Sequence, residues 1–279
     1  MPDCNNLSSM RSPLKWAGGK KKLADNIKQL LPSKGKGRLI EPFVGGGSVF
    51  LNSDFDEYLL LDMNKDLINL FNILKSDSFN FITEAEHYFQ SEYNTAEQYY
   101  ELRAKFNKSN DPFFRSLIFL YMNRHGYNGL CRYNKSGGYN VPFGRYKKPY
   151  FPKMELEFFA KKSQRALFIQ GDFDVAFNLA KSGDAIYCDP PYSPINRTSN
   201  FTSYAGNTFD DDDQIRLVKC AEAAKNKNIP TLISNHDTEF TREIYSGAKT
   251  LSKLKVHRSI SSKGHGRVKV FELMVLYEK

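Results

Sequence analysis

The chain has 279 residues, which is enough for one large domain or for one domain with a sizeable insertion. Hydrophobic residues at 41% and charged residues at 25% are ordinary for a soluble globular protein. The formal charge of +9 suits a protein that neutralises phosphates. Charge alone leaves nucleic-acid binding open, because many basic proteins bind none.

Further features of the composition argue against whole classes of protein. The four cysteines lie far apart without a CxxC pair, which argues against a zinc cluster and a disulfide framework. Residues 1–11 are polar, unlike a signal peptide, and no segment approaches the about 20 apolar residues that span a bilayer. We therefore expect a soluble intracellular protein with no membrane partner. We also expect no metal, since the histidines and cysteines lack ligand spacing.

The chain opens with alternating strands and helices. Residues 38–44 predict a short buried strand, which three glycines at 45–47 interrupt, and the apolar residues after Ser48 can open a helix. Residues 58–62 predict a second strand, and residues 65–75 have helical spacing. This start indicates an α/β fold with a doubly wound sheet.

The middle of the chain follows a different pattern. Residues 72–125 predict successive helices and no strand, the last beginning with Asp111 as cap and Pro112 at the first helical position. Residues 126–150 are rich in glycine, asparagine and tyrosine and predict a long hairpin with polar edges. This part would be a helical insertion.

Alternating strands and helices resume after the insertion. Strands are predicted at residues 166–170, 185–188, 231–234 and 268–277, the last with residues 251–257 as its candidate partner. Residues 211–227 predict an amphipathic helix with Ile215, Val218 and Ala221 on one side. Residues 1–70 and 152–279 would then form one sheet domain, and residues 71–151 a second domain whose hairpin spans about 127–147.

A glycine loop at residues 42–47 follows the first predicted strand. Glycines there let backbone amides approach a ligand, and Asp62, which ends the next strand, is placed to accept hydrogen bonds from a ribose. The loop is not GxGxxG, so a nicotinamide cofactor is not favoured. The alternative is a tight turn that binds nothing.

The segment Asp189-Pro190-Pro191-Tyr192 follows an apolar strand, at the strand end where α/β proteins bind ligands. Proline cannot donate a backbone hydrogen bond, and two prolines hold the chain extended. The Asp189 carboxylate and the Pro190 carbonyl would be two neighbouring acceptors for an exocyclic amine, with Tyr192 as a stacking face. The alternative is a rigid turn after a strand.

Three other groups receive structural interpretations. Ser234, His236 and Asp237 are too close in sequence for the geometry of a hydrolase triad. Cys188 could suggest a nucleophile, but strand alternation points it away from Asp189, so we expect a buried thiol. Residues 210–213 predict a helix cap with favourable charge.

Several motifs together resemble the DNA adenine methylase (Dam) family. In order they are KWAGGK (15–20), EPFVGGGS (41–48), NRHGYNGLCRYN (123–134), VPFGRYKKP (141–149), DPPY (189–192) and LISNHD (232–237). The likeness covers nearly the whole chain from Leu14. It implies a Rossmann-like class I methyltransferase sheet that uses S-adenosylmethionine, with an inserted helical target-recognition domain that carries the hairpin. DPPY alone would indicate only an amino-methyltransferase, and the hairpin match points to a GATC target.

The resemblance also implies roles for individual residues. The catalytic group would be Asp189, Pro190 and Tyr192. Residues that bind or line the cofactor pocket would be Trp16, Lys20, Glu41, Phe43, Gly45, Asp62 and Asp189. Lys15 and Arg132 would read guanines, Leu130 and Pro142 would pack on the thymine, and Tyr127 and Asn128 would fill the gap left by the adenine. Backbone contacts would come from Arg103, Arg124, Asn134, Asn140 and Lys147. In the motif, His125 stands where a tyrosine is familiar, and residues 1–12 lack a family counterpart.

The chemistry of the hairpin agrees with this resemblance. Arg132 and Arg145 can make bidentate contacts to guanine edges, while Lys147 and Lys148 suit phosphates. Interleaved tyrosines suit stacking. The alternative is an exposed basic loop with structural tyrosines.

We therefore expect an enzyme that flips adenine out of duplex GATC and methylates its N6 amine directly. Its partner would be double-stranded DNA, the protein would be monomeric by default, and it would act in the cytoplasm of a bacterium, encoded by the cell or by a phage. Three alternatives stay open. They are methylation of cytosine N4, whose motif more often starts with serine, an RNA substrate, and a DNA-binding regulator without activity, against which the intact DPPY and glycine motifs count.

Overall fold

The computed structural model describes residues 9–20, 23–31, 37–194, 209–257 and 269–279. Its strands form a seven-stranded sheet in the order β3-β2-β1-β4-β5-β7-β6. The chain divides into two compact units, one made of residues 1–24, 44–54 and 62–170, and the other of residues 25–43, 55–61 and 171–279. The predicted α/β class is confirmed, and the predicted domain boundaries at 71 and 151 stay a prediction.

The second unit contains most of the sheet. Its strands are β1 (Arg38–Glu41), β2 (Glu57–Asp62, whose last residue falls in the other unit), β4 (Ala185–Cys188), β5 (Thr231–His236), β6 (Thr250–His257) and β7 (Lys269–Tyr277). The pairs β1–β2, β1–β4 and β4–β5 are parallel, and β7 runs antiparallel to both β5 and β6. All four residues of β4 are buried, as expected for a central strand covered on both faces.

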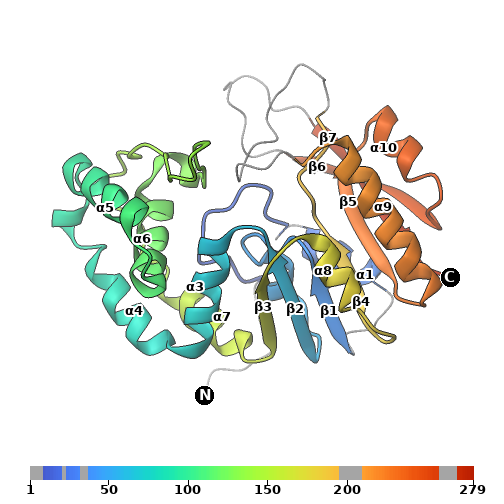
Figure 1. Cartoon of the computed structure of the whole chain (residues 1–279), viewed down its shortest axis with the longest axis horizontal. Helices are drawn as coiled ribbons and strands as arrows, with labels where there is room; N and C mark the ends of the chain where they lie inside the picture. The colour runs from blue at the N-terminus through green and yellow to red at the C-terminus, as the bar shows by residue number, and fades with distance from the viewer. Residues whose placement is uncertain (1–8, 21–22, 32–36, 195–208, 258–268) are drawn as a thin grey trace. The chain divides into compact units, whose positions relative to one another are not determined.

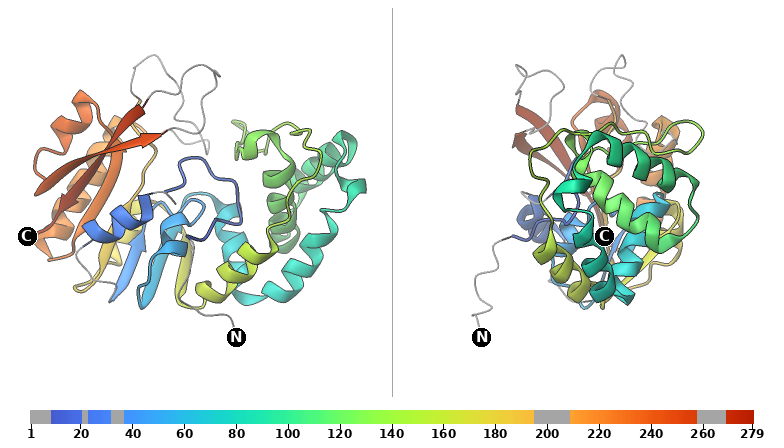
Figure 2. Two further views of the ribbon diagram at one scale, coloured as in Figure 1. Left: turned by 180° about the vertical axis from the view of Figure 1, so that it is seen from behind. Right: turned by 90° about the vertical axis from the view of Figure 1, so that its left-hand side faces the viewer.

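Helices cover both faces of these strands. They are α1 (Ala24–Leu30), α8 (Phe173–Asn178), α9 (Asp211–Asn226) and α10 (Glu239–Ile244). Figures 1 and 2 show α8 and α9 on one face and α1 on the other. The acidic cap of α9 is confirmed, because the Asp210 side chain accepts from the amide of Asp213 and the Asp213 side chain accepts from that of Asp210.

The first unit is mostly helical (Figure 1). Its elements are α2 (Ser48–Asn52), α3 (Lys65–Ser76), α4 (Ser78–His87), η2 (Ser91–Tyr93), α5 (Ala96–Lys108), α6 (Pro112–His125), η3 (Tyr127–Gly129), α7 (Lys153–Ser163) and β3 (Ala166–Gln170). Helix α6 packs against α3, α4 and α5, and every residue from Ser116 to His125 is buried. Its start is as predicted, since Asp111 accepts from the amide of Phe113 and Pro112 opens the helix.

The predicted hairpin at residues 126–150 forms only in part. Antiparallel pairing is limited to two isolated bridges, Gly126 with Phe143 and Tyr133 with Tyr139, and no regular strand lies between residues 126 and 150. Side chains of α5 take the place of a neighbouring strand. Asn107 bonds both the amide and the carbonyl of Tyr139. Backbone groups satisfied in this way need no regular ladder.

Two smaller predictions were wrong. The first strand ends at Glu41 rather than at residue 44, because Pro42 has no amide hydrogen to continue the ladder. Ile215 is 37% exposed, whereas Gln214 is 1% exposed and faces the core with Val218 and Ala221. A buried glutamine has to hydrogen-bond, and its partners lie beside the candidate active site.

No helix in the described part of the chain is long and apolar enough to cross a membrane.

Candidate active site and nucleic-acid interface

Asp189 follows the last residue of β4, as predicted, and it is half-buried. The hydroxyl of Ser234 on β5 donates to Asp189 Oδ1 at 2.9 Å. The hydroxyl of Tyr187 lies 3.0 Å from Ser234 Oγ, and Tyr187 is only 2% exposed, so burial raises the pKa of its phenol well above the ordinary value. The neutral phenol of Tyr187 can therefore donate to Ser234 Oγ. Ser234 itself donates to Asp189 and fixes the orientation of one carboxylate oxygen.

Tyr192 is held at both its face and its tip. The ring of His236 packs edge-to-face on it, with ring centroids 4.7 Å apart, and its hydroxyl donates to Glu272 Oε2 at 3.2 Å. His236 Nδ1 lies 2.7 Å from the carbonyl oxygen of Ser193. Since a carbonyl can only accept, Nδ1 carries the hydrogen and the imidazole is fixed in orientation.

Ser234, His236 and Asp237 do not form a catalytic triad. Ser234 points to Asp189, while His236 Nδ1 faces Ser193 and Asp237 pairs with Arg242 and Lys253. Cys188 is fully buried, as predicted, and burial raises the pKa of its thiol well above the ordinary value. A thiol in that state is a poor nucleophile.

Two predicted cofactor residues lie at the carboxyl end of β1 in the second unit. Glu41 is 3% exposed. Phe43 packs against Phe173, with centroids 5.5 Å apart, and edge-to-face against Phe209 at 5.6 Å. Sequence patterns did not single out Phe173 and Phe209, although Phe173 follows the predicted strand that ends at Gln170 by only three positions.

Apart from Asp189, the remaining cofactor residues lie in the first unit, which contains the three glycines of the glycine loop. Gly45 and Gly47 have φ values of +49° and +72°, which glycine adopts without strain. A Cβ on Gly45 would stand 2.7 Å from Trp16 Nε1, so the loop has room for the indole only because the residue is glycine. Lys20 is 6% exposed and its Nζ donates to the carbonyl of Gly18.

Asp62, at the end of β2, forms a hydrogen bond with the glycine loop. Its Oδ2 accepts from the amide of Gly45 at 3.0 Å, and its Oδ1 accepts from the amide of Asn64 at 2.9 Å. Burial raises the pKa of this carboxyl, while the two amide bonds oppose the rise. Each oxygen accepts one of these bonds, and a carboxylate oxygen can accept more than one. The group is therefore oriented and still able to accept from a ligand hydroxyl.

The structure brings Lys15 to the base of the hairpin, although at least 108 positions separate it from its partners there. Asn123 bonds both the amide and the carbonyl of Lys15 at 2.8 Å. The ammonium of Lys15 donates to the Arg124 carbonyl and lies 4.0 Å from the centroid of the Tyr146 ring. Burial, and secondarily the charge of Arg124, lowers the pKa of Lys15. A Cβ on Gly129 would stand 2.3 Å from the Lys15 Cβ, which explains the glycine.

The predicted DNA-contacting residues differ in how much of their surface is available. Arg132, Tyr127, Asn128, Pro142, Arg145 and Lys147 are exposed, and so is Asn134. Arg132 Nε donates to the Asn140 side chain at 2.8 Å, which directs the guanidinium along the hairpin. Leu130 and Asn140 are half-buried. Arg103 donates to the Val141 carbonyl.

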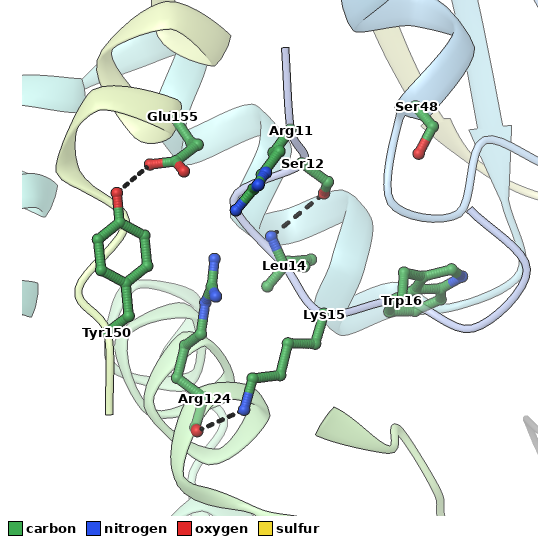
Figure 3. A pocket seen from close by; sticks show the side chains of 9 residues that line it. All are labelled: Arg11, Ser12, Leu14, Lys15, Trp16, Ser48, Arg124, Tyr150 and Glu155. Carbon is green, nitrogen blue, oxygen red and sulfur yellow. Dashed lines mark hydrogen bonds between the residues drawn. The ribbon is translucent and has the colours of Figure 1, made fainter. Parts of the chain in front are cut away.

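Arg124 is the most enclosed of these residues. It is 8% exposed, its guanidinium donates to the carbonyl of Pro13, and burial lowers its pKa to about 10. Figure 3 shows it with Lys15 and Arg11 in a pocket of about 280 Å³. One carboxylate, Glu155, lines the same pocket and accepts from the hydroxyl of Tyr150 at 2.9 Å. Three cations against one anion make the pocket attractive to a phosphate.

A family model described as D12 class N6 adenine-specific DNA methyltransferase matches residues 16–260. The chain belongs to this family. Its relatives include proteins named DNA adenine methylase. That of Vibrio cholerae El Tor Inaba N16961 is 56% identical over 272 residues, which cover 97% of each chain. That of Escherichia coli K12 is 54% identical and covers 98% of this chain and 97% of its own. That of Haemophilus influenzae Rd is 53% identical and covers 95% and 92%.

The family identifies the protein as an adenine-specific DNA methyltransferase, so its substrate is DNA, and the predicted membership is confirmed. Among the residues that the structure describes, no group of three or more His, Cys, Asp or Glu side chains could hold a metal ion. The catalytic, cofactor and DNA roles of individual residues stay predictions.

Proposed function

We propose that this methyltransferase transfers the methyl group of S-adenosylmethionine to N6 of an adenine flipped out of duplex GATC. The observation that carries the proposal is the Asp189 carboxylate. Ser234 fixes one of its oxygens, and the two prolines that follow have no amide hydrogens, so the adjacent Pro190 carbonyl would be a second acceptor. Two adjacent acceptors match the two hydrogens of an exocyclic amine.

Residues of this chain would act on the adenine by holding it. Asp189 and the Pro190 carbonyl accept from the N6 amine, which directs the nitrogen lone pair to the donor, and Tyr192 supplies the flat face against the base. The donor supplies a methyl group already activated by a sulfonium. As the methyl group joined N6, its bond to sulfur would break and S-adenosylhomocysteine would leave as a neutral thioether, and the proton that N6 then loses would pass to water. Orientation would thus contribute much of the acceleration.

The donor fits the residues assigned to it. Asp62 is oriented by two amides and can accept from ribose hydroxyls. Phe43 is half-buried and packs on the buried Phe173, and its aromatic ring would suit an adenine ring. Trp16, Lys20, Glu41 and Gly45 complete the assigned set. The fit rests on the chemistry of these side chains within each unit.

The hairpin would select the site. Tyr127 is 52% exposed, and Asn128 is held in a left-handed conformation with φ of +52°, so both project toward solvent and could enter the base stack. Removing a base from the stack requires a few kcal/mol, which such contacts would partly offset. Lys15 and Arg132 would read guanines, and Leu130 with Pro142 would contact the thymine methyl. The DNA backbone would be contacted by Arg103, Arg124, Asn134, Asn140 and Lys147, and Arg145 would make a bidentate contact to a guanine edge.

Methyl transfer to two short duplexes tests the proposal. One contains GATC and the other has one base pair of the site changed, and the methylated nucleoside is then identified. Label in N6-methyladenine of the first duplex alone supports the proposal. Equal label in both would contradict the assignment of Arg132 and Leu130. Label on cytosine, or none with DNA binding retained, would contradict the proposed chemistry.

A further inference from the structure

The loop that carries Asp189 and Tyr192 lacks two of its backbone donors. Pro190 and Pro191 have no amide hydrogens, so the segment needs partners from elsewhere. The structure provides one on each side of Tyr192. Gln214 Nε2 donates to the Pro191 carbonyl at 2.8 Å, and the Ser193 amide donates to Asn235 Oδ1 at 3.1 Å.

These two side-chain amides are bonded to each other. Asn235 Nδ2 lies 3.0 Å from Gln214 Oε1 and 2.9 Å from the hydroxyl of Tyr245, which is itself 3.4 Å from Gln214 Oε1. Gln214 is 1% exposed, and Asn235 and Tyr245 are fully buried. Because each amide nitrogen donates and each amide oxygen accepts, neither side chain can flip without losing bonds. A satisfied buried network of this kind rigidifies the groups it joins.

Asn235 also forms a hydrogen bond with the backbone of His236, whose ring contacts Tyr192. Its Oδ1 accepts the amide of His236 at 2.8 Å as well as that of Ser193. His236 then contacts the Tyr192 ring and donates from Nδ1 to the Ser193 carbonyl. One amide oxygen thus accepts from the backbone amides of both Ser193 and His236, and the Ser193 carbonyl in turn holds the imidazole next to the Tyr192 ring.

We propose that Gln214 and Asn235 are positioning residues for adenine methylation, which hold the backbone on both sides of Tyr192 and thereby set the Pro190 carbonyl and the aromatic face against the amine. The inference rests on the proposed roles of Asp189, Pro190 and Tyr192. It explains why helix α9 buries Gln214 where its pattern predicted the apolar Ile215. An apolar residue of similar size would fill the space but could not donate to the Pro191 carbonyl.

Two substitutions of Gln214 test this proposal. Gln214→Met keeps the volume and removes both hydrogen-bonding atoms. We expect its single-turnover rate, with DNA and S-adenosylmethionine saturating, to fall about 10- to 100-fold, since small misplacements of reacting groups have effects of this size. The dissociation constants for the same DNA and S-adenosylmethionine should stay within about threefold. Asp184→Asn is the matched control, because it weakens a buried ion pair with Arg38 in the same unit and leaves the loop untouched.

Gln214→Glu gives a second readout, the pH profile of the single-turnover rate, measured together with the dissociation constants for DNA and S-adenosylmethionine, because unfolding would weaken binding as well and a misplaced loop would not. Protonated glutamic acid can donate to the Pro191 carbonyl as the amide does, and burial raises the pKa of such a carboxyl. The rate of this variant should therefore approach that of the unchanged protein at low pH and fall as pH rises through the raised pKa. Gln214→Met should show no such loss with rising pH. If Gln214→Met folds poorly, this pH profile carries the test alone.

The outcomes separate the positioning role from the proposed chemistry. Rates of both Gln214 variants within about twofold of the unchanged protein at every pH, with Asp189→Ala inactive, would overturn the positioning role and leave the proposed function intact. A normal rate for Asp189→Ala would instead overturn the proposed site itself. A rate loss in Asp184→Asn as large as in Gln214→Met would assign the effect to general destabilisation and overturn the positioning role.

Discussion

The hairpin and the loop after β4 are both irregular segments, but different kinds of contact hold them in place. The hairpin has two isolated bridges, exposed side chains and a few bonds from α5. The loop at residues 189–193 is anchored by buried side chains of α9 and β5 on both sides of Tyr192. In the proposed function, the hairpin contacts DNA of varied sequence, and its side chains are exposed. The loop would orient one amine, and buried hydrogen bonds hold it in place.

The largest effect that separates the two regions is expected at Asp189. Asp189→Ala removes an acceptor that would direct the amine, so the single-turnover rate on a GATC duplex should fall by roughly 10³-fold. The dissociation constant for the same duplex, measured by fluorescence anisotropy, should change little. A large loss of DNA binding with a normal rate at saturation would reverse the roles of the two regions.

Arg132 should affect selectivity rather than the rate at saturation. Its guanidinium is exposed and donates to Asn140, and in the proposed function it reads a guanine. Arg132→Ala should reduce discrimination at one base pair by about 1–3 kcal/mol, roughly 5- to 150-fold. Competition between duplexes altered one base pair at a time measures this. Uniform weakening across all sequences would show that Arg132 contacts only the backbone.

His125 should make the base of the hairpin sensitive to acid. It is fully buried, its Nε2 has no partner, and burial lowers its pKa to about 4 from an ordinary 6.5, with the charge of Lys15 acting in the same direction. The folded state therefore favours the neutral ring. Its contribution to stability is complete above about pH 6.5 and is lost as pH falls toward 4, to a total of up to about 3 kcal/mol.

His125→Phe tests this expectation, because it keeps an aromatic ring between Tyr121 and Phe89 and removes the titrating group. Urea unfolding at about pH 7.5 and about pH 5 gives the free energy of unfolding of both proteins. The unchanged protein should lose more stability than the variant at the lower pH. Equal losses would show that folding does not lower the pKa of His125.

The smallest effect is expected at Lys147, which is exposed at the edge of the hairpin. Lys147→Ala should weaken binding to all duplexes alike and reduce the slope of log K against log salt concentration by about 0.9, the value for one phosphate contact. Titrations at several salt concentrations measure the slope. A change in sequence preference would show that Lys147 reads bases.

The sequence predicted the strands well because buried strands are short apolar runs. β4 and the β6–β7 pair lie where they were expected. It predicted the hairpin less well, because Asn107 and Arg103 of α5 satisfy backbone groups that a strand would otherwise pair. Local patterns contain no signal for such partners.

The motifs of the candidate site could be predicted from the sequence, but the residues that hold these motifs in place could not. Asp189 and Tyr192 could be selected from four adjacent residues. Gln214 lies 23 positions from Pro191, and its partner Asn235 lies a further 21 positions along the chain, so only the fold shows that they meet. Helical periodicity pointed to Ile215, because it treats a polar residue as solvent-facing and cannot register a buried hydrogen bond.

The most direct test of the contrast between the two regions is a matrix of single-turnover rates and dissociation constants. It compares Arg132→Ala and Asp189→Ala with the unchanged protein, on a GATC duplex and on one with a guanine pair changed. Arg132→Ala should lose discrimination between the duplexes and keep the GATC rate at saturation, whereas Asp189→Ala should lose the rate and keep the binding preference. If both variants lost both properties to a similar extent, hairpin and loop would not act separately and the account would be contradicted.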